Sequence, residues 1–112
     1  MLSTKNRLRK KKEFSFIYKK GQSYHNKYLT LYVYKTKFNF SKIGFSVNNK
    51  VGNSVVRHKI KRRLTEILRV YIKSLPTNNY IFVAKTGCEN LDFYGLKEQV
   101  NNIIEKMKDE KW

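Results

Sequence analysis

Basic side chains crowd the segment between Val51 and Lys73, and they are the residues of this sequence best suited to chemistry. At 100° per residue on a helix, five of them cluster on one side and two lie further round: Arg57, His58, Lys61, Arg62 and Arg69, then Lys59 and Arg63. Glu66 is the only acid in the segment, whereas solvated helix faces commonly mix both signs. The pattern favours a phosphate-binding face over an ordinary solvated face.

The helix that carries this face is predicted by its apolar spacing. Apolar side chains recur at intervals of three and four residues, at Val56, Ile60, Leu64, Ile67 and Tyr71. Asn53 is a suitable N-cap residue. The backbone N–H groups of Gly52, Asn53 and Ser54 would lie at the positive end of the helix dipole, which suits either a phosphate or an ordinary capped helix start.

Aromatic side chains form a second candidate site. Phe14 and Tyr18 lie on one face of a helix predicted over Lys11–Lys20 and ended by Gly21, and Tyr32 and Tyr34 share one face of a strand predicted within 28–35. Unpaired nucleobases stack on such rings, with roughly 1–3 kcal/mol lost per base on alanine substitution. The alternative is that the rings are core residues, which is the stronger interpretation for Phe14 taken alone.

The remaining predicted strands and helix indicate an α/β (α+β) fold. Residues 43–47 alternate like a strand and are expected to pair antiparallel with 28–35, and the apolar run 80–84 predicts a strand buried on both faces. Asp92 is expected to cap a last helix with the apolar stripe Leu96, Val100, Ile103, Ile104 and Met107. We expect one compact domain, residues 1–112, with a central mixed sheet, about three helices and a βαβ unit around the central helix.

Charge indicates the class of partner. The chain has 25 Lys and Arg against 8 Asp and Glu, a net charge of +17, and residues 1–73 hold 20 of those bases and only 2 of the acids. A polyanion bound by this surface should show affinity that falls steeply with salt.

No apolar run approaches the roughly 20 residues of a membrane helix, and no apolar segment follows Lys5 and Arg7, so we expect no secretory signal and a cytoplasmic location.

Catalytic side chains are not evident. His25 and His58 are far apart in the sequence and have no carboxylate at a fixed helical offset, and no spacing typical of zinc ligands is present. Glu13 and Glu66 are expected to form ion pairs with Lys or Arg, and Cys88, the single cysteine, is expected to be an inert small side chain. We therefore predict no catalytic residue and no metal ligand in the protein itself.

The segment Gly52–Glu66 closely resembles the signature helix of the bacterial ribonuclease P protein family, usually written G-N-A-V-x-R-N-R-x-K-R-x-x-R-E. Seven positions match: Gly52, Asn53, Val55, Arg57, Lys61, Arg62 and Glu66. Lys59 keeps the expected charge, whereas Ser54, His58 and Thr65 depart from the pattern. The resemblance also covers Asn6-Arg7-Leu8, Phe14, Tyr18, Tyr32 and the strands near 43–47 and 80–85, in the expected order.

The resemblance implies a left-handed βαβ crossover and a protein subunit that assists a catalytic RNA in removing the 5′ leader from precursor tRNA. Its implied partners are ribonuclease P RNA and precursor tRNA, with magnesium held mainly by the RNA subunit and the substrate, and no membrane or obligate protein partner. Phe14, Tyr18 and Tyr32 would line a leader-binding cleft. The implied RNA-binding residues of the signature helix and its approach are Lys50, Asn53, Arg57, His58, Lys59, Lys61 and Arg62.

Three other interpretations fit parts of the pattern. A small ribosomal or structural RNA-binding protein needs the same charge and size, but does not require leader-binding aromatics together with the signature helix. A DNA-binding regulator would be expected to show a helix-turn-helix pattern or an apolar dimer seam, and the sequence shows neither. A self-sufficient ribonuclease would need the catalytic side chains that we do not find.

Overall fold

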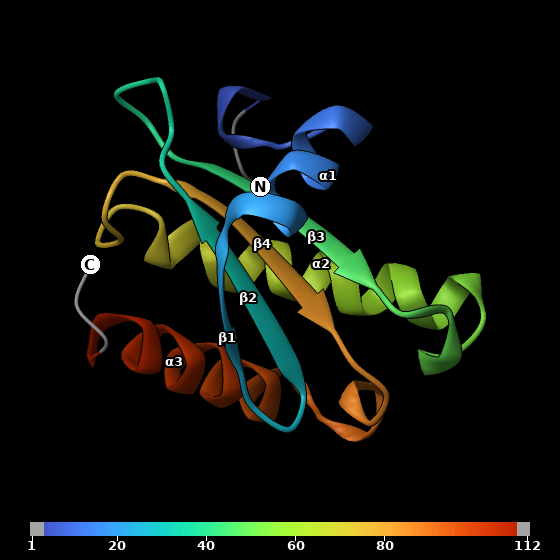
Figure 1. The fold of residues 1–112 in the computed structure, drawn as a ribbon. Helices are drawn as coiled ribbons and strands as arrows, with labels where there is room; N and C mark the ends of the chain where they lie inside the picture. The colour runs from blue at the N-terminus through green and yellow to red at the C-terminus, as the bar shows by residue number, and fades with distance from the viewer. Residues whose placement is uncertain (1–3, 110–112) are drawn as a thin grey trace.

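In the computed structural model, which describes residues 4–109, four strands form one sheet and three α-helices cover its faces (Figure 1). The elements in chain order are α1 (Lys11–Lys20), β1 (Gln22–His25), β2 (Leu29–Tyr34), β3 (Lys42–Val47), α2 (Ser54–Tyr71), β4 (Asn79–Ala84) and α3 (Phe93–Asp109), with 3-10 turns at Thr4–Asn6, Asn49–Val51 and Cys88–Asn90. Residues 1–3 and 110–112, the two ends of the predicted domain, lie outside the described residues. Met1–Ser3 belong to the N-terminal segment in which we expect no secretory signal.

The sheet has the strand order β1-β2-β4-β3. The β2 strand pairs antiparallel with both β1 and β4, whereas β3 pairs parallel with β4, with Phe45 opposite Phe82. The predicted βαβ unit is therefore β3-α2-β4. The predicted antiparallel pairing of β2 with β3 is wrong, because β4 returns through α2 and inserts between them.

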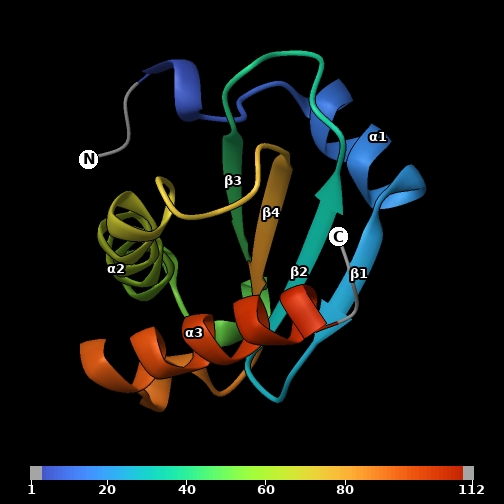
Figure 2. The same ribbon diagram turned by 90° about the vertical axis from the view of Figure 1, so that its left-hand side faces the viewer.

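The crossover from β3 to β4 is left-handed. In Figure 1 both strands run toward the lower right, β3 lies on the upper right side of β4, and α2 passes behind the sheet. This hand is rare among parallel crossovers, and it agrees with the family resemblance. The side view in Figure 2 separates the layers, with α1 on one face of the sheet and α2 and α3 on the other.

The β1 strand was not predicted from the sequence. It is a four-residue edge strand in which only Tyr24 is buried, so its alternation is too short to be recognised. It joins β2 through a turn in which the side-chain oxygen of Asn26 accepts hydrogen bonds from the backbone N–H groups of Tyr28 and Leu29 (3.0 and 2.8 Å). Lys85 and Lys106 donate to backbone oxygens of Asn26 and His25 in the same turn, at 2.7 and 2.5 Å.

Two apolar cores lie on opposite faces of the sheet. The larger one packs β2, β3 and β4 against α2 and α3, and it buries the predicted α3 stripe completely. On α2 it buries Ile60, Leu64 and Ile67 as predicted, together with Leu68, while Val56 and Tyr71 pack at its margin. The smaller core under α1 contains Leu8, Ile17 and Ile81. With so few buried residues, this second face leaves several aromatic rings partly open to solvent.

Gly21 ends α1 where the sequence places it. Its backbone N–H donates to the carbonyl of Ile17 (2.7 Å), and its φ of −76° is ordinary for any residue. Glycine is needed for space, because a Cβ at this position would lie 2.7 Å from the Ile17 oxygen and 2.8 Å from the Val33 oxygen. The close approach lets the chain turn directly from α1 into β1.

Other sequence expectations also have outcomes in the described residues. The Glu13 carboxylate pairs with Lys42 (3.4 Å) and that of Glu66 with Arg69 (3.2 Å), which confirms the predicted ion pairs. Cys88 is buried, and burial raises the pKa of its thiol to about 11, as an inert side chain requires. No helix within residues 4–109 has the length and apolar content to span a membrane.

Candidate nucleic-acid interface

Three aromatic rings form a row on the α1 face of the sheet. Phe14 and Tyr18 are one helical turn apart on α1, with ring centroids 6.2 Å apart, and Tyr32 of β2 meets Tyr18 edge-on at 4.9 Å. Tyr18 is 39% exposed, and the other two rings are half-buried. The fold thus brings together all three residues predicted for a leader cleft, and we call them the aromatic row.

Phe14 is placed by a glycine beneath it. Its ring lies over Gly44 of β3, where a Cβ would be 2.5 Å from the Phe14 Cζ atom and 3.1 Å from the Cβ of Leu8. A bare backbone at this point lets the ring approach the sheet. The interpretation of Phe14 as part of a core is therefore half right, since the ring packs against the smaller core and also faces a surface groove.

The predicted basic face of α2 is largely unoccupied by other protein groups. His58, Lys59, Lys61 and Arg62 are exposed, and none of their side chains has a hydrogen bond or ion pair with a residue in 4–109. Arg63 and Arg69 differ, because Arg63 donates to the backbone oxygen of Leu91 (3.0 Å) and Arg69 pairs with Glu66. The four exposed side chains are available to an external anion.

At the start of α2, polar side chains form hydrogen bonds within the protein. The side-chain oxygen of Asn53 accepts from the N–H of Val56 (3.0 Å), so Asn53 is the predicted N-cap. Arg57 donates to the Gly52 backbone oxygen and to the Asn49 side chain, at 3.2 and 3.0 Å. These bonds hold the Arg57 guanidinium at the helix start.

Near this helix start, the remaining predicted residue and a small hollow complete the surface. Lys50 is exposed in the 3-10 turn before α2. A hollow of about 220 Å³ is lined by Val47, Ser54, Arg57, His58 and Lys61. Asn53 therefore caps α2 as predicted, and the hollow lies beside this capped helix start.

A groove of about 870 Å³ joins the aromatic row to the basic face. Its walls come from the N-terminal segment (Arg7, Leu8 and Arg9), from β3, from α2 and from the Phe14 ring, which belongs to both surfaces. The N-terminal segment reaches this place because Leu8 donates its N–H to the Ile43 oxygen (3.0 Å) at the open edge of β3. The exposed surface is thus continuous and basic, with aromatic rings at one end.

Arg7 and Arg9 were not predicted as site residues. The basic run that begins at Arg7 is visible in the sequence, but its position beside α2 depends on the bridge between Arg7 and Ile43 of β3, which are 36 residues apart in the chain. The predicted residues Lys59 and Phe14 line the same groove although they are distant in sequence. Arginine side chains at that place add positive charge to the groove wall.

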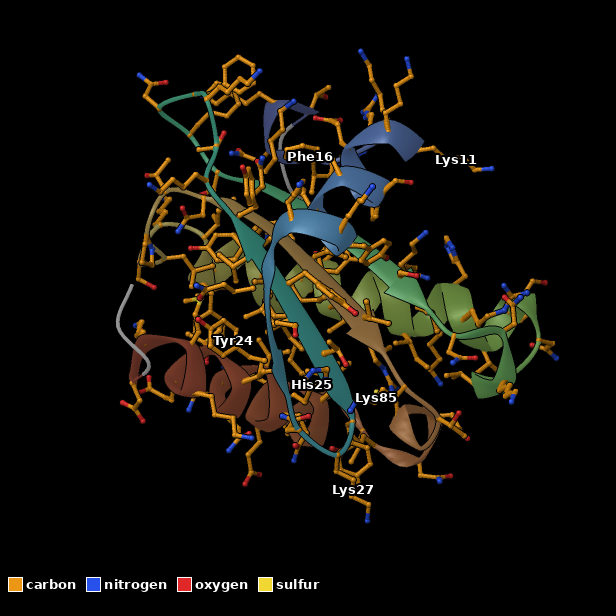
Figure 3. All side chains as sticks on the ribbon, in the orientation of Figure 1. Lys11, Phe16, Tyr24, His25, Lys27 and Lys85 are labelled. Carbon is orange, nitrogen blue, oxygen red and sulfur yellow. The ribbon has the colours of Figure 1, made fainter. Side chains whose placement is uncertain are left out.

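Potential catalytic groups lie apart from one another. His25 is at the β1–β2 turn, where its Nδ1 lies 3.2 Å from the Thr30 hydroxyl, and Figure 3 places it at the opposite end of the molecule from α1. His58 is on α2 among cations. No three His, Cys, Asp or Glu side chains within residues 4–109 are grouped so that they could hold a metal ion. The surface described above instead presents exposed cations and aromatic rings.

A family model for ribonuclease P matches residues 2–108. The chain belongs to the ribonuclease P protein family. It is 38% identical over 103 residues to the ribonuclease P protein component of Clostridium botulinum strain 657, covering 90% of this chain and 93% of that one, and 42% identical to that of strain Alaska E43, covering 89% and 86%.

The fold agrees with solved structures of the family. The RNase P protein of Staphylococcus aureus superimposes with a TM-score of 0.88 at 28% identity, covering 92% of this chain and 95% of that one. The Thermotoga maritima RNase P protein gives a TM-score of 0.81 at 27% identity, covering 89% and 96%. This agreement extends to the single α+β domain with its mixed four-stranded sheet and three helices.

Family membership establishes the function. The chain is a protein subunit of ribonuclease P, a ribonucleoprotein endoribonuclease whose RNA subunit is catalytic and which removes the 5′ leader from precursor tRNA. This result decides against the ribosomal, DNA-binding and self-sufficient ribonuclease interpretations of the sequence.

Proposed function

We propose that the aromatic row grips the single-stranded 5′ leader of precursor tRNA. The observation that carries this proposal is the grouping of Phe14, Tyr18 and Tyr32, in tilted and edge-to-face contact, on a strongly basic protein, with Tyr18 39% exposed. Unpaired bases stack on such rings while nearby cations neutralise their phosphates. In this arrangement the leader lies across α1 and β2, and its 3′ part reaches the groove beside Phe14.

The basic face of α2 then contacts the RNA subunit and the substrate close to the cleavage site. Lys59, Lys61 and Arg62 supply unengaged cations, and His58 lies among them. Lys50, Asn53 and Arg57 extend this surface at the helix start, with Arg57 held in place by Gly52 and Asn49. Dense positive charge is what brings two polyanions together.

The protein side chains bind and orient in this proposal, and the RNA carries the chemistry. Magnesium is held mainly by the RNA subunit and substrate, which fits a chain whose described acids are few and, at Glu13 and Glu66, already ion-paired. Residues 1–112 act as a single RNA-binding domain in the cytoplasm, with the ribonuclease P RNA and precursor tRNA as partners. No membrane or obligate protein partner is required.

The experiment compares precursor tRNA with mature tRNA. The holoenzyme with Tyr18→Ala should lose affinity for precursor tRNA by about 5- to 150-fold, the effect of one lost stacked base, and keep its affinity for mature tRNA. Tyr94→Ala is the matched control, because Tyr94 is a 76% exposed tyrosine on α3, on the opposite face of the sheet from α1. Equal losses for both RNAs would exclude the leader assignment.

Reconstitution tests the division of labour. Cleavage of precursor tRNA at low magnesium should require both the RNA subunit and the protein. Cleavage by the protein alone would contradict the absence of a catalytic side chain, and tight RNA binding without stimulation would contradict the subunit role.

A further inference from the structure

A second group of aromatic rings lies on the opposite side of α1 from the aromatic row. Phe16 is offset by about 160° around the helix from Tyr18 and is 49% exposed, and its ring meets Tyr34 of β2 edge-on at 5.1 Å. In the β2–β3 loop, Phe38 and Phe40 stack with centroids 5.0 Å apart and an interplanar angle of 15°. We call these four residues the loop surface.

One lysine bridges the β2–β3 loop and α1, the two segments that carry three of these four rings. Lys42 donates to Glu13 of α1 (3.4 Å), one turn before Phe16, and its ammonium lies 5.1 Å from the centroid of Phe38. Figure 3 shows Phe16 on α1 near the end of the molecule from which the β2–β3 loop projects. Lys42 therefore links α1, the helix that carries Phe16, to the loop that carries Phe38.

Three of these four rings are not explained by core packing, whereas Tyr34 packs against the smaller core. Phe16, Phe38 and Phe40 pack against neither of the two apolar cores of the described residues, and Phe38 is 53% exposed. The loop is nevertheless well anchored at its base, where Ser41 is buried and its backbone oxygen accepts from Asn6 (2.7 Å). Within the loop, Phe38 donates its N–H to the Thr36 hydroxyl (3.2 Å). A preformed stacked pair, with Phe38 exposed and Phe40 half-buried, on an anchored loop is suited to binding a partner.

The charge around these rings identifies the partner's chemistry. The Lys5 ammonium lies 5.3 Å from the Phe40 centroid, and Lys35 and Lys37 are exposed in the loop. Lys12, Lys19 and Lys20 are exposed three or four residues from Phe16 on α1, so they flank it. Glu13 is the only acid on these elements, and it is paired with Lys42. Stacked rings surrounded by cations match unpaired bases on a polyanionic strand.

We propose that the loop surface is a second binding site for unpaired RNA, separate from the aromatic row. A base stacks on the Phe38–Phe40 pair or on Phe16, and the flanking phosphates meet the surrounding lysines. The strand comes either from the RNA subunit or from the leader upstream of the nucleotides in the aromatic row, and the chemistry is the same in both cases. The proposal rests on the RNA-binding role described above.

Affinity measurements distinguish the two sources. The variant Phe38→Ala/Phe40→Ala is tested for binding to the isolated RNA subunit and, in the holoenzyme, to precursor tRNA with a short or a long leader. A loss of fivefold or more is expected in one arm, as for removal of one stacking platform. A loss for the RNA subunit assigns the strand to that RNA, whereas a loss confined to the long leader assigns it to the substrate. Tyr94→Ala is again the control.

Losses no larger than the control in both arms would overturn the loop surface as an RNA site. Tyr18→Ala in the same holoenzyme keeps the two proposals separate. If Tyr18→Ala weakens binding while the loop variant does not, only the second site fails. If the wild-type protein itself neither binds nor stimulates the RNA subunit, the proposed function fails.

Fluorescence gives a direct readout of stacking. The Phe38→Trp variant, with Trp112→Phe to remove the only natural tryptophan, places an indole in the loop surface. Single-stranded RNA should quench this indole more strongly than an RNA duplex carrying the same number of phosphates, because paired bases are not available to stack. Equal quenching by both RNAs, or none, would show charge attraction without stacking and would overturn the proposal.

Discussion

Lys61 and Arg62 on α2 offer a direct test of the basic face, because their replacement by alanine should flatten the salt dependence of binding to the RNA subunit. Both side chains are exposed and have no hydrogen bond or ion pair among residues 4–109. Their removal therefore costs little folding energy, since surface substitutions usually change stability by less than about 0.5 kcal/mol. What changes is the number of RNA phosphates that the protein neutralises.

The magnitude follows from counterion release. Log affinity falls with log salt, and each phosphate contact contributes about 0.7–0.9 to the steepness of that fall. Loss of two contacts should therefore reduce the steepness by about 1.4–1.8. Between about 50 and 200 mM salt, a fourfold change, the affinity deficit of the variant should shrink by about 7- to 12-fold. Measurement of the dissociation constant at four or five salt concentrations resolves such a difference.

A matched control separates position from net charge. Lys97→Ala/Lys108→Ala also removes two cations, from exposed positions on α3 whose side chains are equally unengaged in the described structure. This variant should keep nearly the wild-type slope. If both double variants lower the slope equally, the effect is one of overall charge, and an unchanged slope for Lys61→Ala/Arg62→Ala would refute the α2 face as a contact surface.

Three further changes test packing, capping and burial. Gly44→Ala should push the Phe14 ring away from β3, because the new Cβ would lie 2.5 Å from Phe14 Cζ, and should weaken binding of precursor tRNA several-fold more than of mature tRNA in a binding assay. Asn53→Ala removes the cap of Val56 and should cost about 1 kcal/mol, or about 4–8 °C in the melting temperature by calorimetry, whereas Asn53→Ser should retain most of it. Cys88, whose burial raises its pKa from 9.0 to about 11, should react slowly with iodoacetamide at pH 8 in the folded protein and rapidly in urea. Because the raised pKa favours the neutral thiol, its contribution to stability is full below pH 9 and is lost as pH rises through about 11.

Local structure was largely predictable from the sequence. The bounds of α1, the N-cap of α2 at Asn53 and the buried stripe of α3 follow from spacing and capping chemistry, which act within a few residues. The basic face of α2 also follows from its sequence, because a helix fixes the angle of every side chain. The ion pairs of Glu13 and Glu66 were predictable because cations greatly outnumber acids.

Only the tertiary structure decided which segments are neighbours. Sequence proximity suggested that β2 pairs with β3, but β4 returns between them, and β1 gave no periodic signal of its own. The groove beside Phe14, with its wall of Arg7 and Arg9, likewise depends on contacts between distant segments. So does the link between α1 and the β2–β3 loop, where Lys42 pairs with Glu13 and lies against Phe38. The physical reason is that periodicity and capping are local, whereas strand order and surface grooves depend on how the whole chain buries its apolar faces.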